Sequence, residues 1–98
     1  MNRIDYSQLK TVDHPLMRPL LVITAPKGSL CCGYISIDAL NRNGDAGATV
    51  TGTDNHEQML DAKVRNVSDA GAKLGVKVGM SGQEALERFG ATFENSSA

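Results

Sequence analysis

The sequence has no tryptophan, and aromatic residues make up only 4% of it. Proteins that bind single-stranded nucleic acids stack the bases on aromatic side chains, and binding to the phosphates requires a basic surface. The chain instead carries 10 basic and 11 acidic residues, which give a formal net charge of -1 at pH 7. We therefore expect neither a nucleic acid nor an anionic membrane as a partner.

Long apolar runs are also missing. No stretch approaches the roughly 20 apolar residues that a helix needs to cross a bilayer. The N-terminal segment MNRIDYSQLKTVDHP is polar and lacks the apolar region of a secretory signal. We therefore expect a cytoplasmic protein that does not associate with membranes.

Residues that bind metals are few. Cys31 and Cys32 are the only cysteines, and neighbouring strand residues point to opposite faces, so we expect no disulfide between them. The two histidines, His14 and His56, are far apart in the sequence, and neither belongs to a cluster with metal-ligand spacing. Paired carboxylates, a catalytic triad and a dinucleotide fingerprint are not visible either. We expect neither a metal nor a cofactor.

A length of 98 residues predicts a single domain. We divide the chain into a polar N-terminal arm (1–16), with a short strand near residues 4–6, an α/β domain (17–90) and a fraying C-terminal tail (91–98). A chain this short buries a modest fraction of its surface. Assembly with copies of itself would therefore add stability.

Four segments have the composition of strands. The apolar segments MRPLLVITA (17–25) and LCCGYIS (30–36) are separated by the turn sequence APKG, which predicts a hairpin. DAGATVTG (45–52) predicts a third strand, with small residues on both faces, and VKV (76–78) a short fourth one.

Three segments have helical signals. Ser36 and Gly44 are placed to begin and end a helix over IDALNRN. Ser81 and Glu84 have the spacing of a capping box, which predicts another helix after GMSG. Leu86 and Phe89 of this helix should pack inward.

The longest predicted helix runs between these two. Asp54 and Glu57 would form its capping box, and Gly75 would end it. An apolar stripe recurs at helical spacing along it: Leu60, Val64, Val67, Gly71 and Leu74. Gly71 in this stripe predicts a close approach to a neighbouring element.

The predicted order is strand, strand, helix, strand, helix, strand, helix. A right-handed crossover through the long helix would make the strands 45–52 and 76–78 parallel. The fold class is therefore α/β, with a four-stranded mixed sheet, made of a hairpin and a parallel strand-helix-strand unit, and three helices packed on it.

Four segments in order resemble one protein family: CGY (32–34), GDAGATVTG (44–52), LDAKV (60–64) and LGVKVGMSGQEAL (74–86). They are similar to domain of unknown function 1805, which includes the YunC-like proteins of bacteria and archaea, and the similarity covers about residues 17–89. The resemblance implies tetramers formed through a β-rich N-terminal region, with no assigned activity. The arm of this chain is shorter and more polar than such a region. We expect a homo-oligomer, either a dimer or a tetramer.

Cys32 is the candidate catalytic residue. A nucleophilic or redox-sensing cysteine needs a neighbouring base or positive charge, and the local sequence supplies neither His nor Arg. Free cysteine is also among the most often buried residues. We therefore favour Cys32 as a core residue, with catalysis as the alternative.

A site for an anion is the other candidate. The segment GMSG places Gly79, Ser81 and Gly82 at a helix start, where backbone N–H groups and the helix dipole favour negative charge. Lys63, at the edge of the long apolar stripe, could contact the same ligand or pair with Asp45. Each residue also has a structural interpretation, in which Ser81 is a helix cap, Lys63 covers the core with its stem and Asp45 bonds its loop.

Three functions remain open from the sequence. The first is a domain that binds a small polar or anionic ligand, in a sensing or accessory role. The second is an enzyme that depends on Cys32. The third is a structural module that binds other proteins and no small ligand.

Overall fold

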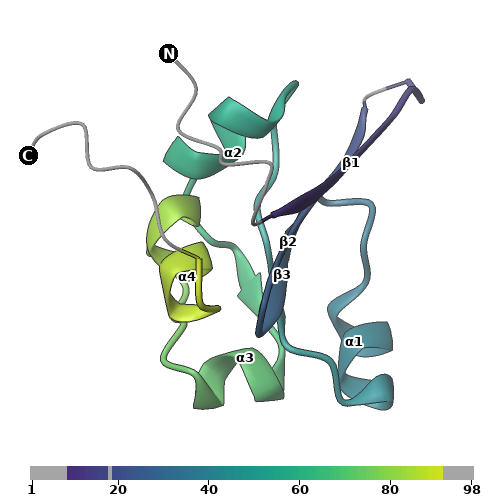
Figure 1. The fold of residues 1–98 in the computed structure, drawn as a ribbon. Helices are drawn as coiled ribbons and strands as arrows, with labels where there is room; N and C mark the ends of the chain where they lie inside the picture. Colours follow the sequence, from purple (N-terminus) through teal and green to yellow (C-terminus); the bar gives the residue numbers. More distant parts are fainter. Residues whose placement is uncertain (1–8, 18, 92–98) are drawn as a thin grey trace, which may run out of the picture.

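The computed structural model describes residues 9–17 and 19–91. In this part of the chain, five strands form one mixed sheet in the order β1-β2-β3-β4-β5, with four helices around it (Figure 1). The elements are β1 Lys10–His14, β2 Leu20–Ala25, β3 Gly28–Cys31, α1 Ile37–Asn43, β4 Gly47–Thr49, α2 His56–Asp61, β5 Asn66–Val67, α3 Asp69–Lys73 and α4 Gly82–Arg88. The predicted α/β class with a mixed sheet is confirmed.

The predicted hairpin is present as the antiparallel pair β2 and β3. β1 adds an antiparallel strand to β2, so part of the segment expected to be an arm is an edge strand of the sheet. The strand predicted near residues 4–6 lies outside the described residues.

The parallel pair is not the one predicted. The sequence suggested 45–52 with 76–78, whereas β4 is parallel to β3, and the short α1 connects them. Residues 76–78 form no strand, and β5 pairs antiparallel with β4 instead. The sheet therefore has five strands rather than four.

The predicted long helix 54–74 is replaced by α2, β5 and α3. Asn55, rather than Asp54, caps α2, and its side chain accepts a hydrogen bond from the Gln58 N–H at 2.8 Å. Ser68 then starts α3, because its buried hydroxyl accepts bonds from the N–H groups of both Gly47 (2.8 Å) and Gly71 (3.1 Å). Such local capping competes with a continuous helix, which explains the break.

The two other predicted helix starts are confirmed. The Ser36 hydroxyl accepts from the Ala39 N–H at 3.2 Å, and Gly44 ends α1 with a left-handed φ of 75°. Ser81 and Glu84 form the capping box at the start of α4.

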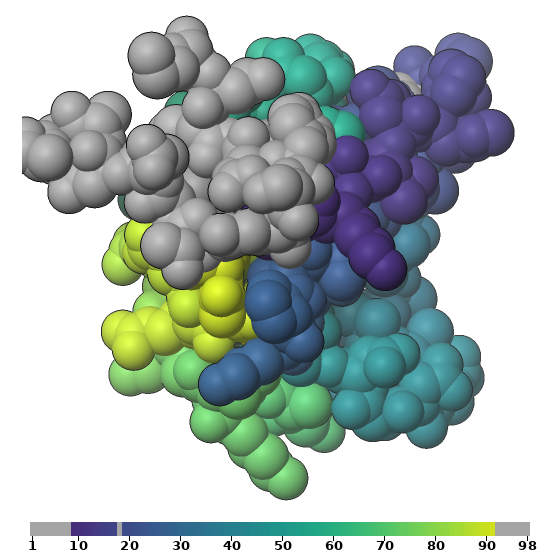
Figure 2. All heavy atoms as spheres, in the orientation of Figure 1, coloured from purple at the N-terminus to yellow at the C-terminus, as the bar shows by residue number. Residues whose placement is uncertain are grey.

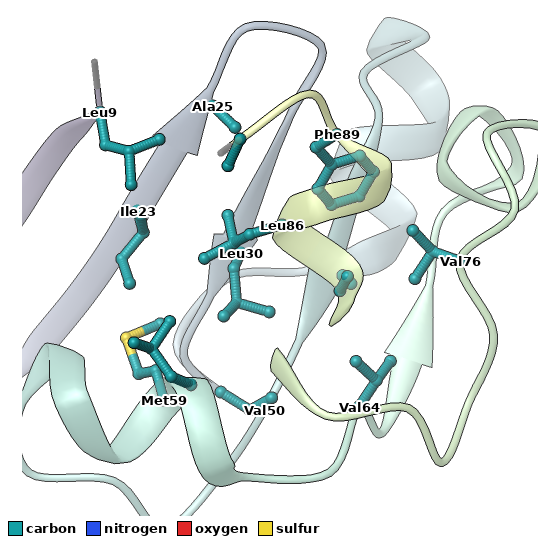
Figure 3. Close-up of a cluster of buried hydrophobic side chains, with 14 of the residues drawn as sticks. Leu9, Ile23, Ala25, Leu30, Val50, Met59, Val64, Val76, Leu86 and Phe89 are labelled. Atoms are coloured by element: carbon teal, nitrogen blue, oxygen red, sulfur yellow. The ribbon is translucent and has the colours of Figure 1, made fainter. Parts of the chain in front are cut away.

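Most of the core lies between the sheet and the pair α2 and α4, while α1 lies on the opposite side of the sheet (Figures 1 and 3). The large side chains buried there come from β2, β3, α2, α4 and the residue that caps the end of α4: Leu21, Ile23, Leu30, Met59, Leu60, Leu86 and Phe89. The inward position predicted for Leu86 and Phe89 is confirmed.

α4 begins in very close contact with α2 because residue 82 is glycine. A Cβ on Gly82 would lie 1.9 Å from the backbone oxygen of Met59 and 2.8 Å from Leu30 Cδ2. The Gly82 N–H also donates to the Ala62 oxygen at 2.9 Å. No larger residue fits here without a shift of the backbone.

We therefore predict that Gly82→Ala destabilises the protein by about 3 kcal/mol, although glycine to alanine at an ordinary helix position adds about 1 kcal/mol of stability. Gly47→Ala is the matched control. Its Cβ would meet the tip of Leu40 at 2.6 Å, and a side-chain tip can move, while the Ser29 backbone oxygen would lie at an ordinary contact distance of 3.4 Å. Urea unfolding should show a much larger loss for Gly82→Ala. Equal losses, or a gain for Gly82→Ala, would contradict the close packing.

Candidate ligand-binding site

The parallel strands β3 and β4 end side by side. The two strands align Cys31 with Thr49, and the Val50 N–H donates to the Cys31 oxygen at 2.9 Å. The loops that follow, residues 32–34 and 51–53, therefore leave the sheet at the same edge. In open α/β sheets, ligands bind in the crevice outside the carboxyl ends of the strands.

A cavity of about 240 Å³ lies at this edge. The first loop, the second loop and the residue before β2 line it: Cys32, Gly33, Tyr34, Thr51, Gly52, Thr53 and Pro19. We call it the strand-end cavity. Each of the two loops contributes three of the seven lining residues, so the cavity depends on the pairing of β3 with β4.

Two glycines let the loops take this arrangement. Gly52 has a φ of 75°, in the left-handed region that favours glycine. A Cβ on Gly33 would lie 3.2 Å from Thr51 Cγ2, so the two loops touch at this point.

Thr53, one of the lining residues, has an unusual buried hydroxyl. The residue is only 6% exposed, and its Oγ1 is the one buried side-chain oxygen or nitrogen without a hydrogen-bond partner in residues 9–17 and 19–91. A buried polar group without a partner costs about 1–3 kcal/mol. Native structures rarely keep such a group without a reason.

Cys32 forms another wall of the cavity and is buried, at 5% exposure. Its Sγ accepts the Leu21 N–H at 3.3 Å, and its own N–H donates to the Leu21 oxygen at 3.0 Å. Among the described lining residues there is no His, Lys, Arg, Asp or Glu that could serve as a base. The position of Cys32 therefore fits a packed side chain better than a nucleophile.

Cys31 points to the other face of the sheet. There it lines a separate groove together with Leu40 and Asp45. Burial, with a smaller contribution from the neighbouring Cys32, raises the pKa of Cys31 from 9.0 to about 12. Cys31 is therefore a neutral thiol at physiological pH.

This raised pKa predicts a specific pH dependence of stability. Above pH 9 the unfolded chain loses the Cys31 proton while the folded chain keeps it, so the stability that Cys31 contributes is lost between pH 9 and about 12. Between pH 8 and 10.5, the unfolding free energy of the wild type should fall by on the order of 1–2 kcal/mol more than that of Cys31→Ala. Urea titrations at both values measure this difference. Parallel losses in the two proteins would contradict the assignment.

The structure brings Lys63 next to the Ser81 loop. Residues 63 and 81 form an isolated antiparallel bridge, flanked by hydrogen bonds from Val64 N–H to the Met80 oxygen (2.7 Å) and from Gly79 N–H to the Val64 oxygen (2.9 Å). Lys63, Gly79, Ser81 and Gly82 line neither the strand-end cavity nor the Cys31 groove.

The donors at this helix start are already used by the protein. The Gly82 N–H bonds Ala62, the Ser81 N–H donates to Glu84 Oε1 at 3.3 Å, and the Glu84 N–H donates to Ser81 Oγ at 3.1 Å. The Glu84 carboxylate adds a negative charge at the same point. This arrangement favours the structural interpretation of GMSG over an anion site.

Asp45 lies apart from these residues. It is exposed, its N–H donates to the Leu40 oxygen at 2.9 Å at the end of α1, and it lines the Cys31 groove. The residues singled out from the sequence thus occupy three places: Asp45 in the groove, Cys32 in the strand-end cavity, and Lys63 with the Ser81 loop.

Tyr34, Thr51 and Thr53 were not among the candidate site residues predicted from the sequence. The signal was present, because CGY and ATVTG both belong to the segments that carry the family resemblance. With α1 taken as the crossover helix, the two segments would have been placed side by side. Because the wrong parallel pair was predicted, the two segments were not expected to lie side by side.

Two further properties concern the described part of the chain. No group of three or more His, Cys, Asp or Glu side chains there could hold a metal ion. Its helices are too short and too polar to include a membrane span.

The comparisons with known proteins agree with this fold. Residues 31–89 match the model of Domain of unknown function (DUF1805), and the chain belongs to this family. It is 34% identical over 70 residues to the uncharacterized protein YunC of Bacillus subtilis, an alignment that covers 67% of this chain and 69% of YunC. The crystal structure of TA1206, a protein of unknown function from Thermoplasma acidophilum, superposes with a TM-score of 0.74 at 26% identity. The superposition covers 84% of this chain and 91% of TA1206.

Proposed function

We propose that this protein binds a small molecule in the strand-end cavity and acts in a sensing or accessory role. The observation that carries the proposal is the cavity between the carboxyl ends of two parallel strands, the position at which ligands bind in open α/β sheets. Thr53, whose buried hydroxyl has no partner among the described residues, is one of the residues that line this cavity.

The competing functions have less support. A cysteine-dependent enzyme would need a base near Cys32, and the described cavity wall contains none. A module that only binds proteins would have no use for a buried threonine hydroxyl without a partner. Valine has nearly the same shape and would fill the same space without the penalty.

Self-association is a further part of the proposal. β1 is an edge strand, and it lies with the turn that follows it at the outer margin of the molecule (Figure 2). Apolar side chains are exposed there: Val12 at 47%, Leu16 at 47% and Met17 at 101%. An exposed edge strand with apolar neighbours favours contact with another chain. We call residues 10–17 the edge ribbon. We expect a dimer or tetramer formed through this ribbon.

The role of Thr53 can be tested with Thr53→Val, which removes the hydroxyl and keeps the shape. The variant should raise the unfolding free energy of the ligand-free protein by about 1 kcal/mol. Thr24→Val is the matched control, because Thr24 Oγ1 is hydrogen-bonded to Ser29 Oγ at 3.1 Å and does not line the cavity. Urea unfolding should show that this control loses stability.

A loss of stability in Thr53→Val would contradict the proposal. That result would mean that the hydroxyl has a structural partner in the folded protein.

The ribbon can be tested separately. The double variant Leu16→Lys, Met17→Lys should sediment as a monomer, because two charges cannot be buried in an apolar contact. Val78→Lys is the control, since Val78 is 66% exposed and lies far from β1 in the sequence. Analytical ultracentrifugation should find an oligomer for the wild type and the control. A double variant with the same mass as the wild type would contradict the role of the ribbon.

A further inference from the structure

We propose that the protein binds a small primary amine, in its ammonium form, in a second pocket on the α1 side of the strand ends. This inference goes beyond the proposed function, because it concerns a site other than the strand-end cavity. The pocket brings together a carboxylate, a hydroxyl and an amide that no described residue uses.

The pocket lies where the chain leaves β3 and β4 in opposite directions. After β3 it runs to α1 on one side of the sheet, and after β4 it runs to α2 on the other side (Figure 1). In α/β sheets such a switch opens a crevice at the carboxyl ends of the strands, where ligands bind. Gly33 and Thr51 line both the strand-end cavity and this pocket, so the two sites adjoin at these residues.

We call this site the α1-side pocket, and its volume is about 320 Å³. The chain from β3 into α1 contributes residues 33 and 35–38, β4 and the loop after it contribute Thr49 and Thr51, and β5 contributes Asn66. Thr49 and Asn66 are opposite each other in the antiparallel pair of β4 and β5. Such residues face the same side of the sheet with Cβ atoms about 4.5–5.5 Å apart. The hydroxyl and the amide are therefore neighbours in the pocket.

Thr49 is the buried polar residue of the pocket. It is only 3% exposed, and its hydroxyl makes no hydrogen bond to another described residue. The hydroxyl is nevertheless open to the pocket, because Thr53 has the one enclosed side-chain oxygen or nitrogen without a partner in residues 9–17 and 19–91. A ligand can therefore donate a hydrogen bond to Thr49.

Asp38 gives the pocket its charge. Its carboxylate is exposed and forms no ion pair within the described part of the chain, although Arg42 lies one turn further along α1. No lysine, arginine or histidine is among the described lining residues. A cation therefore gains an opposite charge in this pocket, whereas an anion would meet a like charge.

An ammonium group matches the free side chains. It has three N–H donors, and one hydrogen bond each can be accepted by the Asp38 carboxylate, the Thr49 hydroxyl and the Asn66 amide oxygen. The half-buried Ile35 and Ile37 offer apolar surface for a short hydrocarbon body. A volume of about 320 Å³ holds about ten water molecules at roughly 30 Å³ each, which suits a ligand on the order of ten non-hydrogen atoms.

Three probes that share one hydrocarbon chain test this inference: hexylamine, 1-hexanol and hexanoate, titrated at pH 7 while the backbone amide NMR signals are followed. Hexylamine, an ammonium ion at this pH, should shift the signals of Ser36, Asp38, Thr49 and Asn66. 1-Hexanol should bind about threefold more weakly, because it lacks the charge that pairs with the exposed Asp38. Hexanoate should bind most weakly, since it meets a like charge.

Two variants and one control extend the test. Asp38→Asn should weaken hexylamine binding about threefold and make it insensitive to added NaCl. Thr49→Val should weaken it about fivefold, the value of one neutral hydrogen bond. Asp45→Asn is the control, because it removes the same charge beyond the other end of α1 and does not line the pocket. Unchanged binding in Asp38→Asn, or an equal loss in Asp45→Asn, would overturn the role of the Asp38 carboxylate.

The outcomes separate this inference from the proposed function. Binding of 1-hexanol or hexanoate at the four amides, as tight as hexylamine or tighter, would overturn the ammonium class. Failure of hexylamine to shift these amides would overturn the α1-side pocket as its site. Shifts confined to Tyr34, Gly52 and Thr53 would place the probe in the strand-end cavity, which would overturn this inference and support the proposed function.

Discussion

The parallel pairing of β3 with β4 is the constraint on which the rest of this structure depends. The elements around the two strands come very close to them, and small residues allow this. Gly47 on β4 leaves room for Leu40 of α1, and a Cβ on Gly71 of α3 would lie 3.0 Å from the Gly47 oxygen. The buried Ser68 hydroxyl then accepts the Gly47 N–H at 2.8 Å and holds the start of α3 against the strand.

The alternation of side chains along the chain explains why the two adjacent cysteines have different surroundings. Successive residues of a strand face opposite sides of the sheet. Cys31 therefore lines the groove beside α1, where burial keeps it protonated, and Cys32 lines the strand-end cavity with Thr53. Both thiols are buried, and the residues with hydroxyl groups in the lining of the cavity are Tyr34, Thr51 and Thr53.

Much of the fold could be predicted from the sequence, because its signals are local. Signals from neighbouring residues predict three features correctly. These are the hairpin, the helix caps Ser36 and Ser81, and the inward positions of Leu86 and Phe89. The break in the long helix could not be predicted this way. It depends on Ser68 bonding Gly47, which is 21 residues away in the sequence. Because one long helix was predicted, the wrong two strands were predicted to be parallel, and the strand-end cavity was not predicted.

The most direct test of the account is a nuclear Overhauser effect between two protons, one on each loop. Gly33 lies against the Thr51 γ-methyl only if β3 and β4 pair in parallel and end together. The account predicts a strong cross-peak between a Gly33 Hα and this methyl group. Absence of that cross-peak, with cross-peaks between strand 47–49 and residues 76–78 in its place, would contradict the topology and with it the proposed site.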